Sequence, residues 1–261
     1  MIKLSIIMPA YNEEKRIGKT LEEYGKFFTN LKKIKILDFE ILIVLNACKD
    51  NTVGVVKEFQ KKIKEIRYLD FEQGGKGFAI IQGFKDALKR NNDLIGFVDA
   101  DMATSPEDFS NLVKNCKFYD GIIASRYVKG AIVNPKQPVQ RIIASRIFNT
   151  LVRTLFLFSY RDTQCGAKLF KKRCLKKIIM EIGETEWAFD VDLLYLSKKN
   201  KFKIKEYPTV WKEPGASKLN LKKASIQMFL AVIQLRIINT RFKKTWWFFG
   251  PIARLLKKIV E

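Results

Sequence analysis

The 261-residue sequence contains no histidine, and its four cysteines are scattered without a CxxC pair. Without histidine, a general base would have to be a carboxylate, lysine, tyrosine or cysteine. Isolated cysteines indicate neither a zinc cluster nor a disulfide framework. The sequence also lacks zinc-finger and RNP signatures, so no common nucleic-acid-binding module is indicated.

Long apolar runs are missing as well. The longest strongly apolar stretch without a charge, residues 224–235, has 12 residues, whereas roughly 18 are needed to suggest a bilayer-spanning helix. Met1 leads directly into a predicted strand, without the features of a secretory signal. We therefore expect a cytoplasmic protein with no membrane-spanning segment.

Positive charge is abundant and unevenly distributed, with 49 Lys and Arg against 27 Asp and Glu and a net charge of +22. Residues 126–180 hold 13 basic residues and one acidic residue, and residues 212–261 hold 11 and two, whereas residues 1–125 carry only +2. A basic surface attracts nucleic acid, an anionic membrane or a phosphorylated substrate. Because these cations lie among bulky apolar residues, we favour a membrane surface or a lipid phosphate and expect no nucleic acid.

Short apolar segments alternate with helical patterns through the first half of the chain. The expected strands are residues 4–8, 39–45, 66–69 and 94–98, and the expected helices are residues 13–34, 50–66 and 77–89. Asn12 and Asp50 are predicted to cap the first two helices. Strands that alternate with helices indicate an α/β fold with a mostly parallel sheet. Ligands of such sheets bind at the carboxyl ends of the strands.

Two carboxylates, Asp99 and Asp101, follow the fourth predicted strand. In an extended segment they project from the same face, where two oxygen ligands can hold Mg²⁺ or Mn²⁺ while water and substrate phosphates complete the coordination. A polar turn is the alternative interpretation of an isolated Asp-x-Asp. Residues 9–13 and Asn46 fall at the same predicted edge, and residues 74–77 (Gly-Gly-Lys-Gly) predict an anion-binding turn before a helix.

Several segments carry a resemblance to a known family. In the first half they are residues 5–14, 49–52, 74–77 and 98–101, and in the second half they are residues 125–126, 161–170, 187–194 and 215–218. The first set resembles the nucleotide-sugar domain of family 2 inverting glycosyltransferases, which have the GT-A fold. The second set resembles the branch that makes dolichyl- or polyprenyl-phosphate glucose and mannose. The resemblance implies a domain over residues 1–218, with a nucleotide-sugar half (1–125) and an acceptor half (126–218).

The resemblance also implies roles for the matching residues on the donor side. Pro9, Tyr11 and Glu13 would surround the base and ribose, Lys76 would face the diphosphate, Asp99 would lie on the ribose or diphosphate side, and Asp101 would bind the metal. Asn46 departs from the family pattern, which has an acidic residue there. The choice between UDP-glucose and GDP-mannose therefore stays open. Ala167 is a second departure, because an aromatic residue usually follows the glycine.

The basic second half suits a phosphate acceptor. Guanidinium groups bind phosphate bidentately, and the candidate ligands are Arg126, Arg141, Arg146 and Arg161. Asp162 and Gln164 are predicted to position the acceptor or the donor sugar. The apolar residues between positions 142 and 158 are predicted either to join the core or to lie in a bilayer interface.

The acceptor decides whether a base is needed. A lipid phosphate is already an anionic nucleophile near neutral pH, whereas a saccharide hydroxyl needs a base, for which Asp190 is the best candidate. We expect an inverting, metal-dependent hexose transfer to a polyprenyl phosphate. The alternatives are a family 2 enzyme that uses a saccharide hydroxyl and a non-catalytic membrane or nucleic-acid adaptor with the same fold.

The C-terminal region, residues 219–261, is predicted to form helices outside this domain. Tryptophans and cations surround an apolar stripe in residues 241–261, a pattern typical of segments that lie among lipid headgroups. This predicts peripheral attachment to the cytoplasmic face of a membrane. A helix that binds a membrane-protein partner is the competing interpretation.

Overall fold

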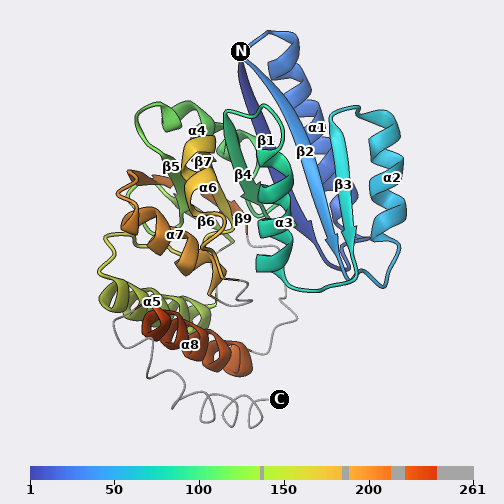
Figure 1. Cartoon of the computed structure of the whole chain (residues 1–261). Coiled ribbons are helices and arrows are strands. Elements are labelled where there is room, and N and C mark those ends of the chain that lie inside the picture. Colours follow the sequence, from blue (N-terminus) through green and yellow to red (C-terminus); the bar gives the residue numbers. More distant parts are fainter. Residues whose placement is uncertain (136–137, 184–187, 213–220, 240–261) are drawn as a thin grey trace.

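The computed structural model describes residues 1–135, 138–183, 188–212 and 221–239 (Figure 1). Its strands are β1 Ile2–Ala10, β2 Leu37–Asn46, β3 Ile66–Phe71, β4 Leu94–Val98, β5 Gly121–Ser125, β6 Ile132–Asn134, β7 Ala167–Lys171, β8 Ile204–Pro208 and β9 Val210–Lys212. Its helices are α1 Ile17–Lys33, α2 Thr52–Lys62, α3 Lys76–Leu88, α4 Pro106–Asn115, α5 Val139–Phe156, α6 Lys172–Ile178, α7 Phe189–Lys199 and α8 Leu221–Ile238, with a 3-10 turn η1 at Cys116–Phe118.

Seven strands form one sheet in the order β3-β2-β1-β4-β7-β5-β8 (Figure 1). Four of its six pairings are parallel, and β7 runs antiparallel to both of its neighbours, β4 and β5. Strands β6 and β9 pair separately. The α/β class with a mostly parallel sheet is therefore confirmed. Because β1, β2, β4 and β5 run in parallel, their carboxyl ends share one edge of the sheet.

Helices cover both faces of this sheet because alternate residues of each strand point to opposite faces. In β1, Ile6 and Met8 belong to the core that includes Tyr24 of α1 and Phe109 of α4, whereas Ile7 belongs to the core that includes Phe84 of α3. Helices α6 and α7 contribute to this second core as well. The sheet is thus buried on both sides, which holds its carboxyl edge in a fixed geometry.

Helices α5 and α8 lie side by side beyond the carboxyl edge of the sheet (Figure 1). Val152 and Phe156 of α5 share a buried cluster with Val232 and Leu235 of α8. Part of the apolar pattern between positions 142 and 158 is therefore core. Among the described helices, α5 and α8 included, none combines the length and apolarity that a membrane crossing requires.

Several predicted boundaries differ from the structure. Asn12 does not cap the first helix, because its backbone adopts a left-handed conformation with φ of 53° and α1 begins only at Ile17. Strand β1 continues through Pro9. Proline is tolerated there because β4 pairs with residues 4–7 of β1, so that Pro9 has a partner strand on one side. Strand 94–98 is confirmed with its predicted bounds.

Some of the predictions concern parts of the chain for which the structure gives no description. Trp187, residues 215–218 and the C-terminal segment 240–261 lie outside the described residues. The predicted attachment of that segment to a membrane or to a partner therefore stays a prediction.

Candidate functional site

The carboxylates that follow β4 lie at the carboxyl edge of the sheet. The Lys76 ammonium at the start of α3 lies 2.5 Å from Asp99 Oδ1. Asp101 Oδ1 accepts a hydrogen bond from the Ala103 N–H at 3.0 Å. The structure thus brings together a cation from the glycine-rich turn and two carboxylates from a different βα connection.

Strand β7 approaches Asp99 closely. The Asp99 N–H donates to the Gly166 carbonyl at 3.2 Å, and Val98 pairs with Ala167. A Cβ atom at position 166 would lie 1.9 Å from Asp99 Oδ2. Any side chain at this position would therefore displace the Asp99 carboxylate, which occupies the space that a Cβ atom would need.

The charges at this edge influence one another strongly. Partial desolvation lowers the pKa of Lys76, but the negative charges of Asp99, Asp190 and Asp101 outweigh it and raise that pKa overall. Burial and the neighbouring Asp99 charge raise the pKa of the Asp101 carboxyl. A site that gathers carboxylates in this way is stabilised by a cation.

A divalent cation fits this donor set. Asp99 and Asp101 supply oxygen ligands of the kind that Mg²⁺ and Mn²⁺ prefer. Within residues 1–135, 138–183, 188–212 and 221–239, no group of three or more His, Cys, Asp or Glu residues could hold a metal ion. The protein would therefore supply part of the coordination, and a bound diphosphate with water would supply the rest.

Asn46, which departs from the family pattern, connects two chain segments at the carboxyl edge of the sheet. Its side chain is buried. In the amide orientation that satisfies both of its polar atoms, the nitrogen donates to the Ala10 carbonyl at 2.8 Å and the oxygen accepts from the Gly75 N–H at 3.2 Å. A carboxylate could not donate to Ala10. Asn46 therefore ties the end of β1 to the turn that carries Lys76.

The segment after β1 presents the remaining donor-side candidates. Tyr11 is 52% exposed, whereas Glu13 forms a bidentate ion pair with Arg16, at 2.7 and 2.6 Å. The Glu13 N–H donates to Thr52 Oγ at 2.8 Å, and the Lys49 N–H donates to Asn12 Oδ1 at 2.7 Å. These contacts fasten the segment to the start of α2 and leave the Tyr11 ring accessible at the same edge as Asp99.

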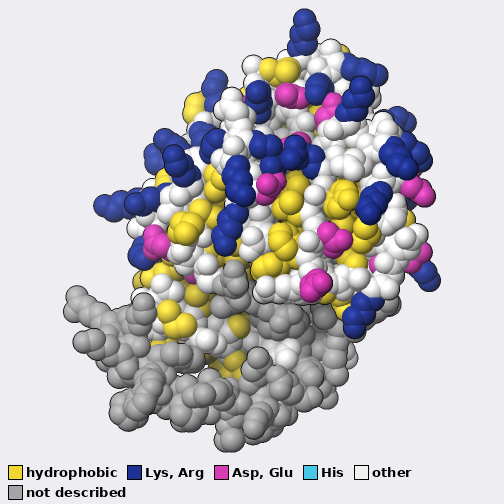
Figure 2. Space-filling model, turned by 45° about the vertical axis from the view of Figure 1, so that its right-hand side comes forward, with side chains coloured by type: hydrophobic (Ala, Val, Ile, Leu, Met, Phe, Trp, Pro, Cys, Tyr) yellow, Lys and Arg dark blue, Asp and Glu magenta, His cyan; other side chains and the backbone are white. Residues whose placement is uncertain are grey.

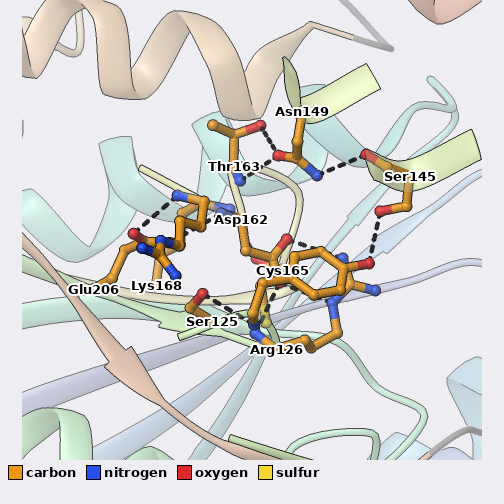
Figure 3. Close-up of polar contacts among 11 residues, drawn as sticks. Ser125, Arg126, Ser145, Asn149, Asp162, Thr163, Cys165, Lys168 and Glu206 are labelled. Atoms are coloured by element: carbon orange, nitrogen blue, oxygen red, sulfur yellow. Dashed lines mark hydrogen bonds and ion pairs between the residues drawn. The ribbon is translucent and has the colours of Figure 1, made fainter. Parts of the chain in front are cut away.

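The loop of residues 161–166 is held by buried charge (Figure 3). The Arg126 side chain donates twice to the Asp162 carboxylate, at 2.8 and 2.9 Å, and the Arg126 N–H adds a third bond at 2.9 Å. Burial alone would raise the pKa of Asp162, but the Arg126 charge and hydrogen bonds hold it below its ordinary value. Arg126 was predicted to bind the acceptor phosphate and Asp162 to position the acceptor or the donor sugar, and the structure pairs the two side chains with each other.

Two further contacts fix this loop (Figure 3). The Glu206 carboxylate of β8 accepts from the backbone N–H groups of Arg161 and Asp162, at 2.8 and 2.9 Å. Asn149 Oδ1 of α5 accepts from the Thr163 N–H at 2.9 Å and from its hydroxyl at 3.0 Å. The loop therefore connects the sheet to α5, and neither Glu206 nor Asn149 belongs to a motif that sequence reasoning selected.

The other predicted acceptor residues lie around this loop. Arg161 is exposed, and Gln164 Nε2 is buried without a hydrogen-bond partner within the described parts of the chain. The Arg146 guanidinium lies 4.4 Å from the centroid of the Tyr127 ring. Arg141 lies near the start of α5 and is partly buried. Their predicted contact with a phosphate stays a prediction.

Asp190, the predicted base, is already engaged. Its Oδ1 lies 2.5 Å from the ammonium of Lys168 on β7, whose side chain is completely buried. Sequence reasoning assigned no role to Lys168, although a lysine within an apolar strand pattern is a detectable signal.

A cavity of about 690 Å³ lies at the opposite edge of the sheet, where β2 and β4 begin. Leu37 and Leu94 line it together with Lys114, Lys117 and Lys171. None of the predicted site residues is among its lining residues. Lys and Arg side chains are also numerous over the upper part of the face in Figure 2. Positive charge is therefore not confined to the acceptor side of the molecule.

Known sequences resemble this chain over most of its length. Residues 5–179 match the family described as Glycosyl transferase family 2. The dolichyl-phosphate beta-glucosyltransferase of Dictyostelium discoideum is 34% identical over 246 residues, covering 90% of this chain and 74% of the relative. The protein of the same name from Drosophila melanogaster is 34% identical, covering 84% of this chain and 69% of the relative.

Solved structures resemble it in fold. Glucosyl-3-phosphoglycerate synthase from Mycobacterium tuberculosis, in complex with Mn²⁺, UDP and phosphoglyceric acid, superposes with a TM-score of 0.67 at 15% identity, covering 92% of this chain and 80% of that one. S. aureus TarS 1–349 gives a TM-score of 0.57 at 19% identity, covering 92% and 66%. At these identities the likeness concerns the fold alone.

Proposed function

Because this chain belongs to glycosyl transferase family 2, we propose that it transfers glucose from UDP-glucose to the phosphate of a dolichyl-type polyprenyl lipid. The observation that carries the proposal is the convergence of Lys76, Asp99 and Asp101 at the carboxyl edge of a GT-A sheet. The relatives named dolichyl-phosphate beta-glucosyltransferase support glucose and the lipid acceptor. UDP bound to a structural neighbour supports the choice of nucleotide.

The donor-side residues stabilise the leaving group. Lys76 stays protonated because the surrounding carboxylates raise its pKa, so its ammonium can meet the negative charge that grows on the departing diphosphate. Asp99 and Asp101 would hold Mg²⁺ or Mn²⁺, which acts as a Lewis acid on the diphosphate oxygens when bound. Tyr11 would stack on the nucleotide base, and its 52% exposure leaves its ring free to do so.

The acceptor side needs no proton transfer in this reaction. A polyprenyl phosphate attacks the anomeric carbon through an oxygen that is already anionic near neutral pH. One bond to the anomeric carbon forms while the bond to the diphosphate breaks, which inverts the configuration at that carbon. A chain without histidine, whose best carboxylate base is paired with Lys168, suits such a nucleophile.

The surface of α5 and α8 suits a membrane-bound acceptor. Val139, Ile143 and Ile147 form one stripe along α5 and are 70%, 54% and 65% exposed. Ile226 and Phe229 of the neighbouring α8 are 48% and 45% exposed. Apolar side chains beside arginines are typical of helices that lie in a membrane interface. We infer a peripheral attachment that holds the carboxyl edge of the sheet near the lipid phosphate, on the cytoplasmic face.

A transfer assay tests the reaction. Purified protein is incubated with Mn²⁺ or Mg²⁺, a radiolabelled donor (UDP-glucose or GDP-mannose) and a short polyprenyl phosphate, with the matching polyprenol and a disaccharide as control acceptors. The expected product is β-linked glucosyl polyprenyl phosphate, its anomeric configuration read by NMR. Transfer to the disaccharide in place of the lipid phosphate would reject the proposed acceptor, and transfer from GDP-mannose alone would reject the proposed donor.

Liposome flotation tests the attachment. Replacing Ile143 and Ile147 with Gln is expected to reduce binding to anionic liposomes by about thirtyfold, since each buried aliphatic side chain contributes roughly 1 kcal/mol or more. The control is Ile36→Gln, because Ile36 is 55% exposed and lies at the opposite edge of the sheet. Equal loss of binding in the control and the double variant would contradict the proposed face.

A further inference from the structure

The cavity at the edge of the sheet opposite the proposed site has an apolar floor. The N-terminus at the top of Figure 1 marks this edge. The cavity volume is about 690 Å³, within the range of roughly 300–1,000 Å³ that is usual for small-molecule sites. The lining residues Leu37, Leu94 and Val113 are only 2%, 6% and 8% exposed, whereas Ile2 and Ile36 are 45% and 55% exposed. An apolar ligand in the cavity would remove these last two side chains from water.

Positive charge surrounds this apolar floor. Asp93 is the one carboxylate among the lining residues, all of which belong to the described part of the chain, and its Oδ2 accepts a hydrogen bond from the Lys3 N–H at 2.8 Å. Five lining residues are cations, namely Lys114, Lys117, Lys171, Lys172 and Arg173. The cavity therefore carries a net positive charge that attracts anionic ligands.

Two of the five cations are already engaged. Arg173 Nε donates to Asp120 Oδ1 at 2.8 Å, and the Lys117 ammonium lies 5.5 Å from the centroid of the Phe118 ring. These two residues add to the local positive charge. The other three cations remain for direct contact with a ligand.

Backbone contacts hold the ammonium groups of Lys171 and Lys172 in place. The Lys171 ammonium donates to the Lys117 carbonyl at 2.9 Å, and the Lys172 ammonium donates to the Arg90 carbonyl at 2.7 Å. Both side chains are half-buried, and neither they nor Lys114 form an ion pair with another residue that the structure describes. An ammonium has three N–H donors, so two donors and the full charge of each stay available. Side chains that are already restrained lose less conformational freedom when a ligand binds.

We propose that this cavity binds a small anionic amphiphile. The apolar body of the ligand would lie against Leu37, Leu94 and Val113, and its carboxylate or phosphate head group would be held by Lys171 and Lys172. The inference goes beyond the proposed function and does not rest on it. Residue 94 begins β4 and residue 99 follows its end, so the length of the strand, roughly 16 Å, separates this cavity from the proposed transfer site.

Surface lysines that contact only water are the plain alternative, because the chain carries a net charge of +22. Surface charge alone attracts any small anion, and an apolar cavity alone accepts any apolar ligand of the right size. The proposed site differs from both because it requires charge and apolar surface in the same ligand. Selectivity among simple probes therefore tests the inference.

Titration calorimetry of the full chain measures this selectivity, with soluble probes below their critical micelle concentrations. Octanoate and octyl phosphate combine an apolar body with the two head groups, octanol lacks the charge, and acetate and inorganic phosphate lack the apolar body. We expect at least one amphiphilic anion to bind about tenfold or more tightly than octanol and than its own small anion, because hydrogen bonds to charged groups and apolar burial both contribute. The tighter of the two identifies the head group. Saturation with UDP and Mn²⁺ should leave this affinity unchanged.

Variants of the lining residues test whether the probe occupies the cavity. Val113→Phe adds bulk to the floor and should weaken binding of the amphiphilic anion at least about tenfold, because its apolar body loses space. Lys171→Met combined with Lys172→Met should weaken this binding about tenfold and leave the affinity for octanol unchanged. Lys57→Met is the control for net charge, because Lys57 is exposed on α2 and does not line the cavity. The thermal midpoint of each variant shows whether it is folded.

Several results would overturn the inference, and the first three need no variant to fold. If neither amphiphilic anion bound the unchanged protein, the cavity would not be such a site. Equal affinity for octanol would show that the cavity does not select an anion, and equal affinity for inorganic phosphate or acetate would show that surface charge alone is responsible. Displacement of the probe by UDP with Mn²⁺, or unchanged binding in a folded Val113→Phe protein, would place the probe elsewhere on the molecule.

Discussion

The two sides of the carboxyl edge use charge in different ways. On the donor side, the side chains of Lys76 and Asp99 are 43% and 24% exposed. On the loop side, those of Arg126 and Asp162 are 9% and 0% exposed. An exposed pair can exchange partners for a ligand at little cost, whereas breaking a buried pair leaves a desolvated charge behind.

This difference in exposure separates two roles of charged residues, ligand binding and loop stabilisation, which look alike in the sequence. Both regions combine cations with carboxylates, and both belong to motifs of the family pattern. The donor side keeps its charges available. The loop side uses charged side chains and one amide to hold residues 161–166 against β5, β8 and α5. Substitutions should therefore affect mainly catalysis on one side and mainly stability on the other.

The largest effect is expected from Arg126→Met, which leaves the Asp162 carboxylate buried and unpaired. We expect the free energy of unfolding to fall by about 3–5 kcal/mol, measured by urea denaturation. Arg153→Met is the control, because Arg153 is exposed on α5 and should change stability by less than about 0.5 kcal/mol. A similar small change in Arg126→Met would mean that the buried pair is not what holds the loop.

Asp101→Ala should impair activity and leave stability nearly unchanged. Removal of the proposed metal ligand is expected to lower kcat/KM for glucosyl transfer by about 10²–10³-fold. The thermal midpoint should change little, because relief of the repulsion from Asp99 offsets the lost hydrogen bond to Ala103. Asp70→Asn, an exposed position on β3, is the control for altered surface charge. Unchanged turnover in Asp101→Ala would remove the argument for a metal at this residue.

Gly166→Ala tests the contact between the 161–166 loop and the donor side, because Gly166 lies directly against Asp99. The added methyl group would lie 1.9 Å from Asp99 Oδ2, so the carboxylate must move away from Lys76. We expect kcat/KM to fall about thirtyfold, since a misplacement on the ångström scale impairs positioned groups. In the control Gly18→Ala, on the side of α1 that faces α2, the nearest atom to the new methyl group is Phe59 Cε2 at 3.4 Å, an ordinary contact. Equal activity in both variants would show that the position of Asp99 does not matter.

Much of the fold follows from local sequence patterns. Strand 94–98 was predicted with its observed bounds because a short apolar run ends directly at Asp99. The start of α1 was predicted wrongly because Asn12 bonds the Lys49 N–H from another loop, and that tertiary contact fixes a left-handed backbone which the capping pattern does not contain. Parallel topology then explains why Asn46 and Asp99 share one edge.

The pairing of charges could not be predicted in the same way. Arg126 and Asp162 are 36 residues apart, and Lys168 and Asp190 are 22 apart. Each residue type is compatible with binding a phosphate, a sugar or another side chain, and only the packing of β7 against β4 and β5 determines which partner is near. Sequence patterns therefore located the region of the site, while the division between exposed and buried charge required the structure.

The smallest expected effect concerns Asp192 of α7, a buried carboxylate that has no ion-pair partner within the described residues. Burial raises its pKa to about 6, against 3.8 for the ordinary group, although the Gly183 N–H bond opposes this. The folded state therefore binds the Asp192 proton more tightly than the unfolded state does. Protonation of Asp192 stabilises the folded protein at low pH, and this stabilisation is lost as pH rises through about 6. Between pH 5 and 8 the loss should be on the order of 1 kcal/mol.

Asp192→Asn keeps an oxygen for the Gly183 N–H and should abolish this part of the pH dependence in urea unfolding. Identical pH profiles for the two proteins would show that burial of Asp192 does not raise its pKa in the folded state.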